Sequence, residues 1–236
     1  QWFFFNRARA QPKKVKEWLI DQVKNKLGPN YNIEKHFTPT YNPWDQRICL
    51  VPGGDFFDAI NEKKATVITD HIERFTEHGI TLKSGKLLEA DMVITATGLN
   101  MEVAGDINID IDGKNLDISS KMFYKSMMIA DVPNMVVTFG YTNASWTLKA
   151  DLTAEYTCRL INHIDKKGYD YCVAITDETI EEDGVWLDFT SGYVERAKHK
   201  FPKQGAKAPW TNTQQYLSDL FAVRYGRIKD KDLKFF

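Results

Sequence analysis

The sequence has few of the residues and patterns that mark several common classes of protein. Its 236 residues include three cysteines and no C-x-x-C pair, so a disulfide framework and a zinc site are poorly supported. No apolar run approaches the roughly 18 residues of a transmembrane helix. The formal net charge of −1 gives no bulk attraction to nucleic acid. These absences predict a soluble, cytoplasmic protein, and the 13% aromatic content supplies apolar surface for a folded core.

Motifs for several kinds of chemistry are also missing. Neither G-x-G-x-x-G nor G-x-x-x-x-G-K-[ST] occurs, so the chain alone lacks the usual cradle for a dinucleotide pyrophosphate. G-x-S-x-G is absent, and the five histidines do not have the spacing of a metal site. Residues 108–113 resemble the start of an EF-hand loop, but Ser119 occupies the position that requires a bidentate carboxylate. Neither a metal nor a serine nucleophile is therefore expected.

Two segments have the apolar periodicity of amphipathic helices. In residues 12–27 apolar side chains recur at three- and four-residue steps, and Gly28-Pro29 ends the pattern. The second helix follows Gly140, with Asn143, Ser145 and Thr147 as alternative N-caps and Lys166-Lys167-Gly168 as its end. Its apolar residues fall at four-residue steps: Leu148, Leu152, Tyr156, Leu160 and Ile164.

Short β-branched and alternating runs predict strands between and around these helices. We expect strands at 65–70, 92–97 and 135–139, and hairpins over 79–88 and 107–118. The 92–97 strand is nearly continuous in apolar residues, which is typical of a strand buried on both faces. Residues 31–62 are predicted to be irregular, because prolines and Gly53-Gly54 interrupt every run. The acidic stretch 177–183 is predicted to be a loop, and the last fifty residues a mixture of helix and coil.

The N-terminal stretch combines aromatic and basic side chains. It begins at Gln1, without Met, and continues into Trp2-Phe3-Phe4-Phe5, so we expect that residues covering these aromatics are missing. Two interpretations are open. The stretch could be an interfacial helix that makes peripheral contact with a membrane, or a docking face for absent protein, which we favour. Its basic residues are Arg7, Arg9, Lys13, Lys14, Lys16, Lys24 and Lys26.

Several segments resemble the class B flavoprotein monooxygenases. Residues 88–99, LEADMVITATGL, are similar to the family's aD-x-[IV]-[IV]-x-ATG strand, where the chain leaves the NADPH domain and enters the FAD domain. Residues 36–47, HFTPTYNPWDQR, and 140–152, GYTNASWTLKADL, resemble Baeyer–Villiger monooxygenases of the ethionamide-activating type. Pro202-Lys-Gln-Gly205 and Pro209-Trp210 add to this resemblance.

The resemblance implies an α/β fold and a division of the chain. Residues 1–98 would be the C-terminal part of an NADPH-binding Rossmann-like domain, including its closing strands. Residues 99–236 would be the C-terminal part of an FAD-binding domain. The family's two glycine-rich fingerprints and its F-x-G-x-x-x-H-x-x-x-W motif are absent from this chain. The chain is therefore expected to be the C-terminal half of a flavoprotein with two dinucleotide-binding domains.

The activity that the resemblance implies belongs to the longer protein. Such an enzyme uses FAD and NADPH to insert one oxygen atom from O2 into a ketone, or to oxidise a sulfur or nitrogen centre, through a C4a-peroxyflavin. Its partners would be a small ketone or sulfur-containing substrate, O2 and the missing N-terminal half. The isolated chain is expected to bind both cofactors weakly or not at all. The alternative is a non-catalytic binding module that retains the flavoprotein scaffold.

Arg47 occupies the position of the family's active-site arginine, beside the flavin and the nicotinamide. A guanidinium there would stabilise the peroxide anion, because it stays charged at any working pH. Without the resemblance, Arg47 reads as the partner in a loop ion pair, and the Gly140 segment as an ordinary strand–helix connection. With it, the helix after Gly140 places its positive N-terminal end near the flavin pyrimidine. The implied cofactor contacts are Gln46, Thr97, Gly98, Asn143, Trp146, Thr147 and Leu148, although Trp146 could equally be a packing residue.

Overall fold

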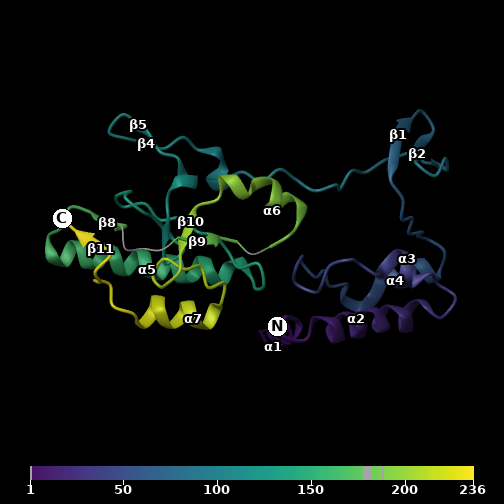
Figure 1. The fold of residues 1–236 in the computed structure, drawn as a ribbon, viewed down its shortest axis with the longest axis horizontal. Helices are drawn as coiled ribbons and strands as arrows, with labels where there is room; N and C mark the ends of the chain where they lie inside the picture. The colour runs from purple at the N-terminus through teal and green to yellow at the C-terminus, as the bar shows by residue number, and fades with distance from the viewer. Residues whose placement is uncertain (1, 178–181, 188) are drawn as a thin grey trace. The chain divides into compact units, whose positions relative to one another are not determined.

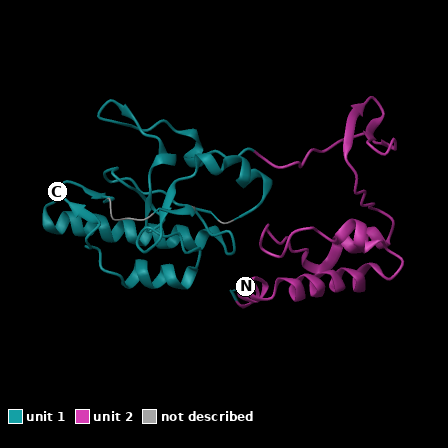
Figure 2. Cartoon of the chain, viewed as in Figure 1, with its two compact units in different colours: residues 1–2, 100–236 teal, residues 3–99 magenta. Residues whose placement is uncertain are grey.

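The structure is a computed structural model that describes residues 2–177, 182–187 and 189–236. The chain forms two compact units, shown in separate colours in Figure 2. Unit 1 comprises residues 1–2 and 100–236, and unit 2 comprises residues 3–99. Both units contain helices and short antiparallel strands, so the expected α/β class is confirmed at this level (Figure 1). The assignment of the two units to NADPH and FAD domains stays a prediction.

Two helices come first in the chain, α1 (Trp2–Ala10) and α2 (Pro12–Leu27), and from Phe3 onward both belong to unit 2. The bounds of α2 match the prediction: Pro12 starts it, and the N–H of Gly28 donates to the Lys24 carbonyl at 2.8 Å. Gly28 adopts φ +82°, a conformation that glycine tolerates better than other residues. The unit's small core gathers side chains from both helices and the following loop: Ala8, Val15 and Trp44, with Phe4, Phe5, Leu19 and Ile48 against them.

The segment 31–62 is more regular than predicted. It contains α3 (Ile33–Phe37), a 3-10 turn at Pro52–Gly54 and α4 (Asp55–Asn61). The Asn32 side chain caps α3 by accepting the N–H of Lys35 at 3.1 Å. The prediction of a wholly irregular segment is therefore wrong, because turn-forming residues here begin short helices instead of only interrupting runs.

A three-stranded antiparallel sheet of β1 (Ile72–Thr76), β2 (Gly79–Leu82) and β3 (Leu87–Glu89) follows. It confirms the hairpin over 79–88 and adds β1, which was not predicted. The strands predicted at 65–70 and 92–97 are both wrong: neither segment forms a strand. Met92 is 77% exposed and Ile94 is 83% exposed, because no strand among the described residues pairs with their segment.

The described residues of unit 1 form four antiparallel pairs of short strands. The hairpin of β4 (Asp110–Ile111) and β5 (Lys114–Asn115) confirms the hairpin predicted over 107–118. Apolar side chains in and beside it pack against a core cluster: Ile109, Ile111, Leu116 and Ile118. The strand predicted at 135–139 reduces to one isolated bridge between Val136 and Met128, so that prediction is wrong. The pairs are β4 (Asp110–Ile111) with β5 (Lys114–Asn115), β6 (Phe123–Tyr124) with β7 (Met128–Ile129), β8 (Cys172–Ala174) with β11 (Leu233–Phe235), and β9 (Glu182–Val185) with β10 (Lys203–Gly205).

The predicted acidic loop 177–183 lies partly outside the described residues, at 178–181, while Glu182 and Asp183 belong to β9. The last fifty residues contain strands as well as helix and coil. Their helical elements are α6 (Gly192–Ala197), α7 (Tyr216–Leu220) and a π-helical turn at Phe221–Tyr225. Short 3-10 turns lie at Val103–Asp106, Ile118–Ser120 and Lys198–Lys200.

Helix α5 (Trp146–Lys167) organises the core of unit 1. It begins and ends where the pattern predicted, with Ser145 as N-cap and Gly168 in the left-handed conformation as C-cap. Its buried face packs on one cluster that includes Tyr124, Met128, Trp210 and Leu233. A second cluster lies around Phe123, Trp186, Leu187 and Phe201. This packing fixes the helix whose N-terminus was predicted to meet the cofactor.

Candidate functional site

The N-terminus of α5 is open to solvent. Of the three possible caps, Ser145 is the one that acts: its hydroxyl accepts the N–H of Thr147 at 3.3 Å and lies 2.7 Å from the Thr147 hydroxyl. Ser145, Trp146 and Thr147 are exposed, whereas Leu148 is half-buried. The first N–H groups of a helix have no acceptor one turn earlier, and they form its positive end. At the start of α5 the Thr147 N–H is taken by the Ser145 hydroxyl, and the Leu148 N–H donates to the Ser145 carbonyl at 3.3 Å. What this helix start presents to a ligand is therefore chiefly its positive end and the exposed hydroxyls of Ser145 and Thr147.

Gly140 allows the chain to pass close beneath the first side chain of α5. A Cβ atom at Gly140 would lie 2.1 Å from Cγ of Trp146, so another residue here would displace the indole. The Trp146 ring packs on Phe139, with ring centroids 5.2 Å apart, and yet the residue is 50% exposed. Trp146 is therefore a packing residue that also presents a free face.

An apolar cavity of about 260 Å³ lies beside this indole. Its walls come mainly from the second core cluster, and include Val137, Phe139, Trp146, Trp186 and Phe201. Glu102 is the one charged residue among those that line it. Such a cavity suits an uncharged apolar molecule in contact with Trp146.

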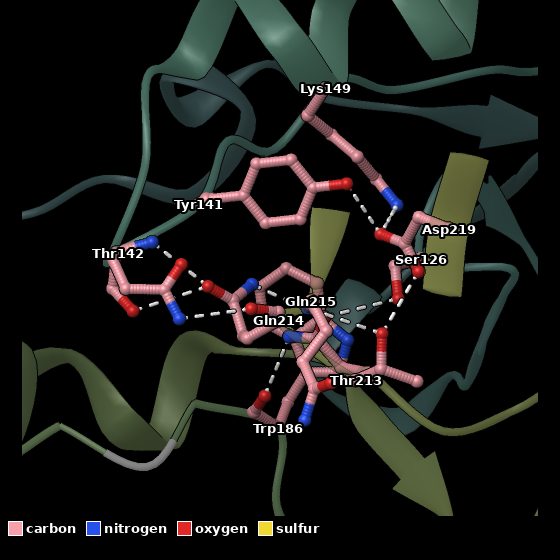
Figure 3. Close-up of polar contacts among 11 residues, drawn as sticks. Ser126, Tyr141, Thr142, Lys149, Trp186, Thr213, Gln214, Gln215 and Asp219 are labelled. Atoms are coloured by element: carbon pink, nitrogen blue, oxygen red, sulfur yellow. Dashed lines mark hydrogen bonds and ion pairs between the residues drawn. The ribbon is translucent and has the colours of Figure 1, made fainter. Parts of the chain in front are cut away.

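A buried ion pair that the sequence analysis missed lies behind the start of α5. Lys149 has a side chain that is only 3% exposed, and its Nζ lies 2.8 Å from Oδ2 of Asp219. The Tyr141 hydroxyl donates to the same carboxylate oxygen at 2.7 Å (Figure 3). Burial, together with the negative charge of Asp219, raises the pKa of Tyr141 well above its usual value. The tyrosine therefore stays a hydrogen-bond donor at any working pH.

In unit 2, Arg47 follows a tight turn. The N–H of Asn42 donates to Oδ2 of Asp45 at 3.1 Å, and the N–H of Asp45 donates to the Asn42 carbonyl, also at 3.1 Å. Trp44, at the centre of the turn, has φ +71° and is buried against Phe5, with ring centroids 5.4 Å apart. A left-handed tryptophan is sparsely populated and persists only where its surroundings hold it. The turn therefore fixes the backbone immediately before Arg47.

Arg47 itself is exposed and lies at the wall of a second cavity, of about 350 Å³. Side chains of α2 and α4 form much of this cavity, among them Leu19, Val23, Phe56 and Phe57. No residue that the structure describes forms an ion pair or hydrogen bond with the Arg47 guanidinium. This geometry does not support a simple loop ion pair and leaves the cation available to a ligand.

The other predicted contacts lie in both units. Gln46 is half-buried and forms a bridge with Pro43, whereas Thr97 and Gly98 are exposed in the extended segment that ends unit 2. Gly98 adopts φ +98°. Gln46, Arg47, Thr97 and Gly98 therefore belong to unit 2. Asn143, Trp146, Thr147 and Leu148 belong to unit 1, where the structure brings them together at one helix start.

The described residues contain neither a metal-binding cluster nor a membrane-spanning helix. Across residues 2–177, 182–187 and 189–236, no cluster of three or more His, Cys, Asp or Glu side chains could hold a metal ion. None of the helices described is long and apolar enough to cross a bilayer.

Comparison with known proteins identifies relatives over nearly the whole chain. No family model matches. The chain is 46% identical over 231 residues to the FAD-containing monooxygenase EthA of Mycobacterium tuberculosis, covering 98% of this chain and 47% of EthA. It is 48% identical over 232 residues to the probable FAD-binding monooxygenase AlmA of Acinetobacter baylyi, covering 98% of this chain and 46% of AlmA.

A solved structure is similar in fold. The crystal structure of OTEMO in an FAD-bound form matches 95% of this chain and 45% of its own, with a TM-score of 0.65 and 17% sequence identity. At that identity the likeness bears on the fold alone. The chain spans about half the length of the curated relatives it matches. The resemblance read from the motifs is confirmed: over 98% of its length this chain is similar to FAD-containing monooxygenases, and it spans about half the length of such a protein.

Proposed function

We propose that the chain is the C-terminal half of an FAD- and NADPH-dependent monooxygenase of the Baeyer–Villiger type. The observation that carries this proposal is the identity of 46–48% to FAD-containing monooxygenases over 98% of the chain. Bound FAD, reduced by NADPH, would supply the activation of O2 for transfer of one oxygen atom to a ketone, sulfur or nitrogen centre. The other half of the protein would provide the glycine-rich loops for the two pyrophosphates.

The donor set at the start of α5 fits the pyrimidine edge of a flavin. That edge is rich in acceptors and carries negative charge when the flavin is reduced. Ser145 and Thr147 provide exposed hydroxyls, and the first N–H groups of α5 add the positive end of the helix. Asn143, Trp146, Thr147 and Leu148 would hold the ring here. In this role the helix favours the reduced, anionic state without moving a proton.

Arg47 would act on a different charge. Its guanidinium follows a fixed turn and has no partner among the described residues, so it can hydrogen-bond to an anionic oxygen that develops during the reaction. A guanidinium acts through its charge and its fork of N–H donors, so this role needs no proton transfer. Gln46, next to it, and Thr97 and Gly98, at the end of unit 2, are proposed as further cofactor contacts.

The apolar cavities support a substrate of low polarity. The walls beside Trp146 and beside Arg47 are both mainly apolar, which suits a ketone with a hydrocarbon body.

The test uses the whole protein together with the isolated chain. We expect the whole protein to purify with bound flavin, to oxidise NADPH and to convert a panel of apolar ketones to products that contain one more oxygen atom. The isolated chain is expected to purify colourless. A flavin-loaded whole protein that neither oxidises NADPH nor oxygenates any ketone or sulfide would contradict the proposed function. A stoichiometric flavin band in the isolated chain would contradict the assignment of the pyrophosphate cradles to the other half.

A further inference from the structure

A segment far along the sequence holds the turn that leads into α5. This segment, residues 212–215, is called the strap below. Oε1 of Gln214 accepts the N–H of Thr142 at 2.9 Å and the Thr142 hydroxyl at 3.2 Å (Figure 3). The main-chain oxygen of Gln214 accepts the Asn143 side-chain amide at 3.0 Å. One residue of the strap therefore fixes two consecutive residues of the turn.

The strap is itself anchored to the second core cluster. Nε2 of Gln214 donates to Oδ1 of Asn212 at 3.2 Å, and Nδ2 of Asn212 donates to the carbonyl of the buried Trp186 at 2.9 Å. The backbone of Gln214 has φ +49°, a left-handed conformation that residues other than glycine rarely adopt. Its surroundings hold it there, and in this conformation both its side-chain and main-chain oxygens reach the turn.

Asp219, on α7, joins the strap to both sides of the turn. Its Oδ1 accepts the Thr213 hydroxyl at 2.9 Å, while Oδ2 serves Tyr141 and Lys149. Tyr141 immediately precedes the turn, and Lys149 lies in the first turn of α5. The start of α5 is therefore fixed from behind by the buried Tyr141 and Lys149 and the half-buried Asp219, while its front, Ser145 to Thr147, stays exposed.

We propose that Gln214 is a positioning residue that sets the place of residues 141–148 before any ligand binds. The inference rests on the proposed function, because the ligand of this helix start is taken to be the flavin. Helix dipoles and N–H groups stabilise a developing charge most when they already point at it. If they had to reorient during the reaction, the free energy of reorientation would offset the stabilisation. Gln214 holds the helix start in this orientation through its hydrogen bonds with Thr142 and Asn143.

The test replaces Gln214 in the whole protein and follows two signals. Gln214→Ala removes both bonds from Thr142 and leaves the main-chain oxygen. We expect the amides of residues 142–148 to exchange with deuterium at least about tenfold faster, since local opening is no longer opposed. We also expect reduced flavin to bind about tenfold more weakly relative to oxidised flavin, which lowers the two-electron midpoint potential by about 30 mV. Gln214→Glu keeps the acceptor oxygen for Thr142 but loses the N–H donor to Asn212 and adds a charge, so it is expected to restore only part of the exchange protection.

The matched control is Thr211→Val, which removes a hydrogen bond from the neighbouring residue to the Gly205 carbonyl, 2.8 Å long, without touching the turn. It should leave exchange at 142–148 and the potential unchanged. Unchanged exchange in Gln214→Ala would overturn the positioning role. Faster exchange with an unchanged potential would overturn its link to the flavin. Failure of the proposed function would be recognised separately, as an unsubstituted whole protein that binds no FAD.

Discussion

The two units differ in how completely they bury their apolar side chains. In unit 1, Tyr124, Met128, Leu152 and Tyr156 are entirely inaccessible to solvent. In unit 2, every residue of β1 is exposed, and the segment with the most apolar strand pattern, 92–97, is exposed throughout. An apolar pattern therefore indicates that a segment is suited to burial. Whether it is buried also depends on neighbouring segments that pack against it. Unit 1 contains those neighbours, and unit 2 lacks them for 92–97 among its described residues.

The largest effect should come from breaking the buried ion pair of unit 1. Asp219→Ala leaves the Lys149 ammonium buried without its carboxylate, which should lower the free energy of unfolding by about 3–5 kcal/mol. The double variant Lys149→Met, Asp219→Leu removes both charges and should recover much of this loss. Urea denaturation followed by tryptophan fluorescence measures both. A double variant as unstable as the single would show that the unpaired charge is not the cause.

Next in size is a cavity in the core of unit 1. Leu152→Ala removes a completely buried side chain from α5 and should cost about 2–5 kcal/mol of unfolding free energy. Ile94→Ala in unit 2 removes a side chain of similar size that is 83% exposed, and should change stability by less than about 0.5 kcal/mol. Thermal and urea unfolding of the isolated chain compare the two. Equal losses would mean that residues 92–97 are buried in solution.

Substitution of Arg47 tests whether this residue of unit 2 contributes to the reaction and not to the stability of the fold. Because its side chain is exposed and has no described partner, Arg47→Ala should leave the unfolding free energy nearly unchanged. In the whole enzyme, oxygenated product should fall by about 10²–10³-fold while NADPH oxidation continues and hydrogen peroxide is released. Arg47→Lys should rescue only part of this loss, because an ammonium lacks the planar fork of donors.

The matched control for Arg47 is Arg74→Ala, which removes another exposed guanidinium of unit 2, on β1. It should leave both product formation and peroxide release unchanged. Product formation by Arg47→Ala that equals the unsubstituted enzyme would contradict the proposed role. A large loss of stability would instead favour a role in bracing the loop.

The smallest effect concerns pH and a thiol of unit 1. Burial raises the pKa of the Cys172 thiol above its usual value. The unfolded chain therefore releases this proton at a lower pH than the folded chain, and the thiol's contribution to stability falls as pH rises above about 8.5. Cys172→Ala should consequently lose less stability than the unsubstituted chain between about pH 7.5 and pH 9.5. The matched control is Cys158→Ala, which removes an exposed thiol of the same unit.

The sequence predicted those elements whose signals are local. Helix α2 and helix α5 have the predicted bounds because periodicity, caps and terminating glycines agree within each segment. The signals for the 79–88 hairpin likewise lie close together in the sequence. Residues 92–97 failed for the opposite reason: the apolar run is genuine, but strand formation depends on partners elsewhere. The pairing of β8 with β11 had no local signal at all.

The candidate site divides in the same way. Ser145, Trp146 and Thr147 could be predicted as an exposed helix start, because caps and dipoles are properties of one segment. Gln214 and Asp219 could not, since nothing near them in sequence indicates Thr142 or Lys149. One signal was present and unused. Lys149 lies three residues before Leu152, on the apolar face of α5, where a lysine requires a buried counter-charge.

The ion pair between Lys149 and Asp219 also has a consequence for the rate of folding. Its partners are separated by 70 residues, whereas unit 2 builds its sheet from three consecutive strands. A contact between residues far apart in sequence requires a long loop to close. The entropy lost in closing it precedes the stabilising contact, which slows folding. The unit 2 hairpins are therefore expected to form early, on the microsecond scale of local pairing. The start of α5 should reach its final position late, only after α7 has docked, so the kinetic barrier of unit 1 lies in assembling its proposed site.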